Sequence, residues 1–82
     1  MSNFKAVSLD YDKNFDRAPE ISSQVFGKEV VEEWISLARS YGIPVRKNTN
    51  LVNVLSESEV GDEIPENTYT DVALILNNII NR

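Results

Sequence analysis

The chain has 82 residues, of which 41% are hydrophobic and 26% charged, and a net charge of −5. A chain of this length forms one small domain, and the composition is ordinary for a soluble globular protein. It contains no cysteine and no histidine, which excludes disulfides, thiolate catalysis, Cys-ligated zinc and the usual general base. We therefore expect no enzymatic activity, no cofactor and no metal ion. The negative charge disfavours nucleic acid as a partner, and no apolar run approaches the ~20 residues that span a bilayer.

Two β-strands are predicted in the first third of the chain. The side chains of residues 4–11 alternate, and this period of two is typical of a strand. One face carries Val7, Leu9 and Tyr11, and the other carries Phe4, Ala6 and Ser8. Residues 12–19 are polar, end in Ala-Pro and read as a loop. Residues 21–26 combine β-branched and small polar side chains and predict the second strand.

A helix and a third strand follow. Residues 28–41 carry apolar side chains at i, i+3, i+4 and i+7, which predicts a helix with one buried stripe centred on Trp34. Gly42 stands just past the end as a left-handed cap, and Pro44 prevents the helix from continuing. Residues 43–47 are predicted as a short strand.

Two further helices are predicted in the C-terminal half. Asn48, Thr49 and Asn50 are all good N-caps for a short helix through residues 51–55, which Gly61 breaks. Pro65 suits the first turn of the last helix. The last helix carries apolar residues on one face: Tyr69, Val72, Ala73, Leu76 and Ile80. The predicted fold class is α/β (α+β), with a small central sheet of about three strands flanked by three helices in the order β-β-α-β-α-α.

One stretch has the spacing of a metal-binding loop. Acidic and amide side chains stand at alternate positions, as at the opening of a calcium loop: Asp10, Asp12, Asn14 and Asp16. The full motif needs glycine at its sixth position and a bidentate glutamate at its twelfth. Phe15 and Ile21 stand there, so the turn would be strained and the coordination incomplete. We interpret the stretch as a solvated acidic turn.

The other polar residues do not form a catalytic pattern. Carboxylates gather within residues 29–33 and 57–63, but they lie among polar neighbours, and acid–base work needs burial that raises one pKa. Ser22 and Ser23 have no histidine to activate them. The basic pair at positions 46–47 is too small for a nucleic-acid footprint and faces either water or nearby glutamates.

A shallow apolar surface is the more informative candidate. Ala18 and Pro19 lie in an exposed-looking loop, and Ala73 and Leu76 stand at i and i+3 on the last helix, whose apolar stripe is wide. One interpretation is that Ala73 and Leu76 are part of the core. The other is that the four residues form a patch that binds a peptide anchor.

Four short segments carry a family resemblance. They read Ala-Val-Ser-Leu-Asp-Tyr-Asp at 6–12, Arg-Ala-Pro-Glu-Ile at 17–21, Gly-Ile-Pro-Val at 42–45 and Val-Gly-Asp-Glu-Ile-Pro-Glu at 60–66. In this order and at this spacing, they resemble the C-terminal cytoplasmic domain of the FlhB-type (FlhB, YscU, SpaS, EscU) export switch proteins of flagellar and type III secretion systems. The resemblance extends over about residues 5–80.

The resemblance implies a site and a location. In the family, this domain lies at the entrance of the export gate, receives secreted subunits and switches specificity from rod- and hook-type to filament-type cargo. Its hydrophobic patch for early cargo is formed by an Ala-Pro pair and by an alanine and a leucine on the last helix. Those positions align with Ala18, Pro19, Ala73 and Leu76, which favours the docking interpretation. The implied location is the cytoplasm, either free or peripheral at the inner-membrane export gate.

Three departures from the family change what we expect. The self-cleaving Asn-Pro-Thr-His element aligns with residues 1–4, which read Met-Ser-Asn-Phe, so we predict no self-cleavage. The strand that precedes the cleavage site in full-length members has no counterpart, so the first strand should be an open sheet edge or pair with a partner's strand. After Ile-Pro-Val, residues 46–50 read Arg-Lys-Asn-Thr-Asn where the family usually has acidic residues and prolines.

We therefore expect residues 1–82 to form a single FlhB C-terminal-like domain, a truncated stand-alone protein that mimics the cleaved fragment. Its expected role is that of a non-catalytic cargo-docking and specificity-switch module of flagellar export. We prefer the flagellum to the injectisome because we identify no sequence feature peculiar to injectisome members. Expected partners are export cargo and export-apparatus proteins, including a full-length FlhB-type protein at the open edge, without membrane insertion. The alternative is a soluble regulatory protein that binds a full-length export protein but no cargo, and full burial of Ala73 and Leu76 would favour it.

Overall fold

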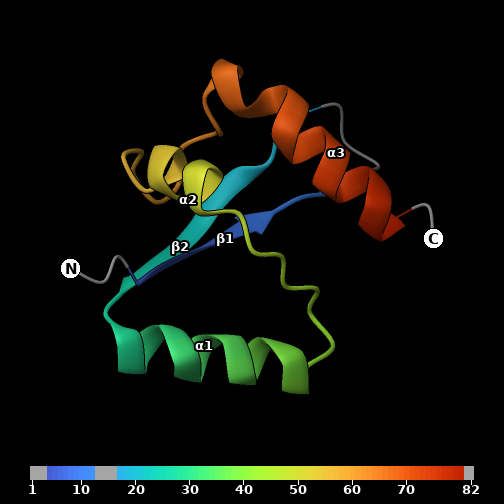
Figure 1. Ribbon diagram of the computed structural model, residues 1–82. Coiled ribbons are helices and arrows are strands. Elements are labelled where there is room, and N and C mark those ends of the chain that lie inside the picture. The colour runs from blue at the N-terminus through green and yellow to red at the C-terminus, as the bar shows by residue number, and fades with distance from the viewer. Residues whose placement is uncertain (1–3, 13–16, 81–82) are drawn as a thin grey trace.

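The computed structural model describes residues 4–12 and 17–80 of the chain, and Figure 1 shows its six elements. In chain order they are β1 (Lys5–Asp10), β2 (Glu20–Phe26), α1 (Lys28–Ser40), α2 (Thr49–Leu55), a 3₁₀ turn η1 (Glu66–Thr68) and α3 (Tyr69–Ile80). The predicted mixture of α and β structure and the three helices are confirmed. The prediction that the buried stripe of the first helix is centred on Trp34 is wrong: Trp34 is 41% exposed, because α1 is rotated so that Val31 is its buried residue. The sheet has two strands rather than three.

The two strands lie between the helices. Helix α1 contacts both strands on one side of the sheet, whereas α2 contacts β1 on the other side, with α3 beyond it (Figure 1). The sheet is therefore covered on both faces, by α1 alone on one and by α2 and α3 on the other.

β1 and β2 pair antiparallel, with one irregularity. Ser8 lies opposite Ser23, but the next pair is Leu9 opposite Ile21, so Ser22 is the extra residue of a β-bulge. The hydroxyl oxygens of Ser8 and Ser22 are 2.7 Å apart, and the Ser8 hydroxyl also hydrogen-bonds with that of Ser23. Beyond the bulge, the opposed Leu9 and Ile21 contribute to the same apolar cluster.

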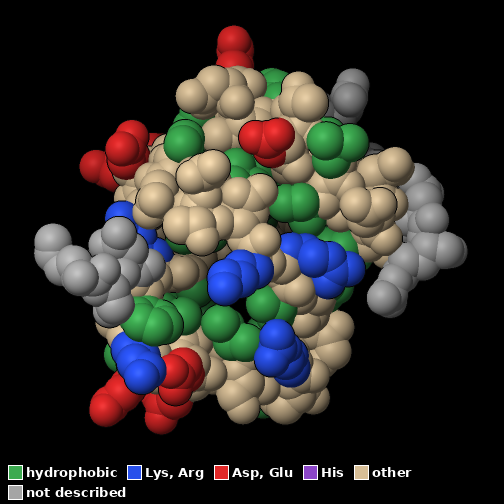
Figure 2. All heavy atoms as spheres, in the orientation of Figure 1, with side chains coloured by type: hydrophobic (Ala, Val, Ile, Leu, Met, Phe, Trp, Pro, Cys, Tyr) green, Lys and Arg blue, Asp and Glu red, His purple; other side chains and the backbone are tan. Residues whose placement is uncertain are grey.

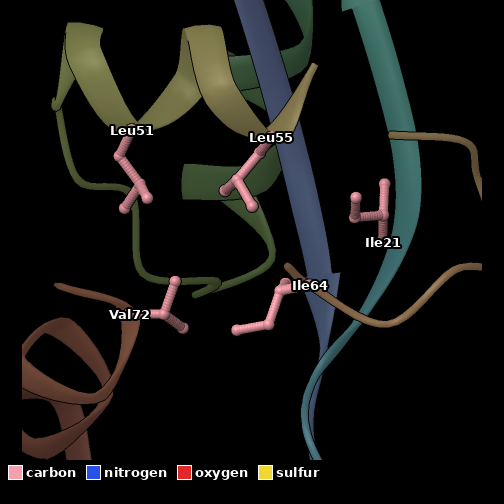
Figure 3. Close-up of a cluster of buried hydrophobic side chains, with 5 residues drawn as sticks. All are labelled: Ile21, Leu51, Leu55, Ile64 and Val72. Atoms are coloured by element: carbon pink, nitrogen blue, oxygen red, sulfur yellow. The ribbon is translucent and has the colours of Figure 1, made fainter. Parts of the chain in front are cut away.

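The hydrophobic core lies between the sheet and helices α2 and α3. Its buried members are Ile21, Leu51, Leu55, Ile64 and Val72. Figure 3 shows these side chains gathered from β2, α2, the segment before η1 and α3. Half-buried apolar side chains pack around them: Val7, Leu9, Ala18, Ile75 and Leu76. The apolar face predicted for the first strand is confirmed at Val7 and Leu9. At Tyr11 it is wrong, because β1 ends at Asp10 and Tyr11 is 39% exposed.

The predicted third strand over residues 43–47 is wrong. This segment has no regular secondary structure and is mostly exposed. Its sequence pattern favours an extended chain, but a strand also needs a neighbouring strand with which to form backbone hydrogen bonds. Pro44 has no N–H to donate to such a neighbour. Within the described residues, β2 is the one strand paired with β1, so the other edge of β1 is open.

A different segment extends the sheet on the side of β2. The N–H of Ile21 donates to the carbonyl of Asp62 (2.8 Å), and the N–H of Gly61 donates to the carbonyl of Ile21 (2.8 Å). The N–H of Ile64 donates to the carbonyl of Pro19 (3.0 Å). Residues 61–64 thus pair antiparallel with the start of β2 and place Ile64 in the core.

The predicted helix caps on either side of residues 43–47 are confirmed. Gly42 has a φ of 73°, and the N–H of Ile43 donates to the carbonyl of Ala38 (2.9 Å), the pattern of a Schellman cap. At the start of α2, the side chain of Asn48 accepts a hydrogen bond from the N–H of Leu51 (3.0 Å), so Asn48 is the N-cap among the three candidates.

The last helix begins later than predicted. Pro65 caps the 3₁₀ turn η1, and α3 begins at Tyr69. The buried Thr68 closes this turn, because its N–H (2.9 Å) and its hydroxyl (2.7 Å) both donate to the carbonyl of Pro65. No helix in the described part of the chain is long and apolar enough to cross a bilayer.

Candidate docking surfaces

The predicted patch residues lie in one region of the fold. Ala18, just before β2, and Leu76, on α3, are both half-buried, and both pack against the core cluster. Ala73 is exposed and stands one turn before Leu76 on α3. The structure therefore brings Ala18 and Leu76 to the border of the same cluster, with Ala73 at the surface one helical turn before Leu76.

Pro19 differs from the expectation of an exposed loop, because it is buried. Its carbonyl accepts the hydrogen bond from the N–H of Ile64, which ties residues 61–64 to β2. Pro19 thus supports the surface formed by its neighbours rather than lying on it.

Tyr69, which the sequence placed on the apolar face of the last helix, is exposed. Its side chain is 44% exposed. It stands four residues before Ala73 and seven before Leu76, and residues at these spacings share one helix face. The spacing was visible in the sequence, but an apolar stripe does not indicate which edge of it stays uncovered.

We group these residues as a candidate apolar surface, which we call the α3 patch: Ala18, Tyr69, Ala73 and Leu76. Alanine side chains leave room for an incoming group, and the leucine and tyrosine offer apolar contact on either side. Such a surface suits one or two small apolar side chains of a peptide.

The open edge of β1 is a second surface. The carbonyl of Phe4 accepts a hydrogen bond from the N–H of Gly27 (3.0 Å), so the backbone groups of Phe4 face β2. In an antiparallel ladder, alternate residues turn their backbone groups outward, which directs those of Lys5 and Val7 to the open edge. An edge of this kind can accept another strand.

A third surface borders α1. Glu32, Ile35, Ser36 and Arg39 line an open hollow of about 410 Å³. On the face shown in Figure 2, Lys and Arg side chains gather with hydrophobic side chains around the lower half of the molecule, over α1 and the segment that leads to α2. Arg46 and Lys47 belong to that segment and are exposed.

Of the four side chains with the spacing of a calcium loop, the structure describes two. Asp10 and Asp12 are exposed, and Asn14 and Asp16 lie outside the described residues. Among the residues that are described, no group of three or more Asp, Glu, His or Cys could hold a metal ion. The ammonium of Lys28 lies 6.0 Å from the ring centre of Phe4.

Comparisons with known proteins agree with one another. The model of the FlhB HrpN YscU SpaS Family matches residues 4–79. Among curated proteins, the chain is similar to the uncharacterized protein YlqH of Bacillus subtilis (strain 168). The two are 37% identical over 71 residues, which is 87% of this chain and 75% of YlqH.

Proposed function

The chain belongs to the FlhB HrpN YscU SpaS family of export proteins, and from this premise we propose that it is a non-catalytic docking module for early export cargo. In this proposal it works on the cytoplasmic side of a flagellar export gate, where it takes the place of the cleaved C-terminal fragment of an FlhB-type protein and contributes to the switch of substrate specificity. A secretion-related role follows from the family alone; the docking role rests on the α3 patch.

One observation carries the docking role. Ala73 is exposed and Leu76 is only half-buried, although both lie on the apolar face of a helix that packs against the core. Full burial of both side chains would have indicated a helix face used only for packing. Their exposure beside Ala18 and Tyr69 supports a surface kept apolar for binding.

The size of the α3 patch sets the expected affinity. A peptide anchor of one or two apolar side chains buries little area, and association costs several kcal/mol of lost freedom. We therefore expect dissociation constants between about 10 μM and 1 mM, or roughly 4–7 kcal/mol. Weak binding suits a module that must release each cargo subunit in turn.

The open edge of β1 supports a second part of the proposal. A full-length FlhB-type protein would bind through this edge by strand addition, with the backbone groups of Lys5 and Val7 forming the new ladder. The partner would anchor the domain at the gate while the α3 patch stays free for cargo.

Peptide binding tests the docking role. N-terminal peptides of rod- and hook-type subunits are titrated into the purified domain and followed by NMR chemical shifts. We expect shifts centred on residues 69–76, and at least about tenfold weaker binding for Ala73→Glu and Leu76→Asp, because each buries a charge under the anchor. Leu74→Asp is the matched control, since Leu74 lies on another side of α3 and is exposed. Equal binding by Ala73→Glu and the unmodified domain would refute the patch.

The regulatory alternative makes a different prediction. In it, no cargo peptide binds at concentrations near 1 mM, but a full-length export protein still does. Hydrogen exchange then decides the role of the edge: strand addition protects the amides of Lys5 and Val7 when the partner binds. Unchanged exchange at β1 in a stable complex would show that the partner uses another surface.

A further inference from the structure

Helix α1 exposes a second row of apolar side chains. We call it the α1 stripe, and its members are Val30, Trp34, Leu37 and Tyr41. Their exposed fractions run from 41% at Trp34 to 75% at Tyr41. The side of α1 next to this stripe already packs on the sheet through the buried Val31 and the half-buried Ile35 and Ala38. The α1 stripe is therefore additional to the face that the fold uses.

The spacing of the α1 stripe is that of a helix-pairing seam. Its members are four, three and four residues apart, the alternation found between the a and d positions of paired helices. The exposed Phe26 precedes the helix, and the exposed Ile43 folds back at its other end. The apolar row thus runs the whole length of α1.

We propose that the α1 stripe binds the α1 stripe of a second copy of this chain, with the two helices antiparallel about a two-fold axis. In this arrangement Val30 lies opposite Tyr41 of the other copy, and Trp34 lies opposite Leu37. Each large side chain then meets a smaller one, which fills the seam evenly. A parallel pair would instead stack Trp34 on Trp34 and Tyr41 on Tyr41.

The charges of α1 favour the same arrangement. The first half of the helix carries Glu29, Glu32 and Glu33 with Lys28, whereas the second half carries Arg39 as its one charge. Antiparallel helices place the acidic half of one copy beside the basic half of the other, and they also oppose the two helix dipoles. Parallel helices would bring the two acidic halves together.

The exposed area is sufficient for a dimer, though not for a tight one. Trp34 and Tyr41 together expose on the order of 200 Å², because a fully exposed aromatic side chain offers roughly 150–250 Å². With the rest of the α1 stripe, Phe26 and Ile43, each copy contributes on the order of 500 Å², and two copies bury about 1,000 Å², the lower limit of a specific interface. We expect a dissociation constant of about 10–100 μM, or roughly 5–7 kcal/mol.

Sedimentation equilibrium of the full chain from about 1 μM to 500 μM tests this proposal. We expect the mass to rise from 9.3 kDa toward twice that value. The single tryptophan, Trp34, should become less accessible to acrylamide over the same range. A mass of one chain at every concentration would overturn the proposal.

Two leucine variants locate the interface. Leu37→Glu should weaken the dimer by at least about tenfold, whereas Leu74→Glu should not, although Leu37 (55%) and Leu74 (60%) are similarly exposed. Circular dichroism checks that both variants fold. A dimer that survives Leu37→Glu, such as one formed through the β1 edge, or one that Leu74→Glu disrupts, would overturn the proposal.

Two substitutions of Tyr41, one acidic and one basic, test the relative orientation of the two helices independently of Leu37. In the antiparallel dimer, residue 41 lies near Glu29 and Glu33 of the other copy. Tyr41→Glu should therefore weaken the dimer at least about tenfold more than Tyr41→Lys. In a parallel dimer, residue 41 faces its own counterpart, so equal losses in the two variants would rule out the antiparallel pairing.

Discussion

The two faces of the small sheet bury very different amounts of apolar surface. On the side of α2 and α3, five side chains form one buried cluster with further apolar side chains around it. On the side of α1, Val31 is the one buried residue of the helix, and the α1 stripe is exposed. The comparison shows that the same sheet has one densely packed face and one sparsely packed face that leaves apolar surface exposed.

The difference also predicts uneven local stability. Segments with few buried contacts open at lower free energy than the core elements. Helix α1 should therefore exchange its amide hydrogens faster than β2, which pairs on one edge with β1 and on the other with residues 61–64.

The largest expected effect is on the packed face. Leu55→Ala removes a side chain that is 3% exposed and central to the cluster (Figure 3). We expect a loss of about 2–5 kcal/mol in the free energy of unfolding, measured by urea denaturation at low protein concentration. A loss below about 1 kcal/mol would mean that the two faces do not differ as described.

A smaller effect is expected at the end of α1. Gly42→Ala places a β-carbon at a φ of 73°, where it would meet no atom within 4 Å. The cost of about 1 kcal/mol is therefore one of backbone strain alone. Hydrogen exchange should show the last turn of α1 losing more protection than α2. Gly42→Asn is the control, because asparagine tolerates this conformation better and should recover part of the loss.

The smallest effect is expected on the exposed face itself. Leu37→Ala at about 1 μM, where the chain is expected to be a monomer, should change the free energy of unfolding by no more than about 0.5 kcal/mol. The same substitution should weaken self-association at higher concentration. A stability loss comparable to that of Leu55→Ala would show that Leu37 belongs to the core.

Local signals in the sequence predicted most of the elements. The alternation of residues 4–11 indicated β1, and the cap at Gly42 indicated the end of α1, because each depends on neighbouring residues only. Long-range pairing could not be predicted in the same way. Residues 43–47 have a strand-like pattern but no partner, whereas residues 61–64 have glycine and charges typical of a turn and nevertheless pair with the start of β2.

For the candidate site, the sequence indicated which residue types stand at each position but not how exposed each side chain is. Ala18 and Leu76 do border one cluster, and whether they bind cargo stays a prediction. The burial of Pro19 depends on its pairing with Ile64, and the exposure of Tyr69 depends on how α3 is rotated against the core. Both are set by contacts between distant segments, so a helix or loop pattern alone does not reveal them.

The composition of the core has a consequence for how the chain folds. Within the described residues, Ile21 is the one member of the buried cluster that precedes Leu51. The first half of the chain therefore has almost no core until the second half is present. Contacts between residues far apart in sequence form slowly, because the intervening chain must close first. During synthesis, β1, β2 and α1 would leave the ribosome unable to form a stable unit, and the domain would fold in one late step once Val72 has emerged.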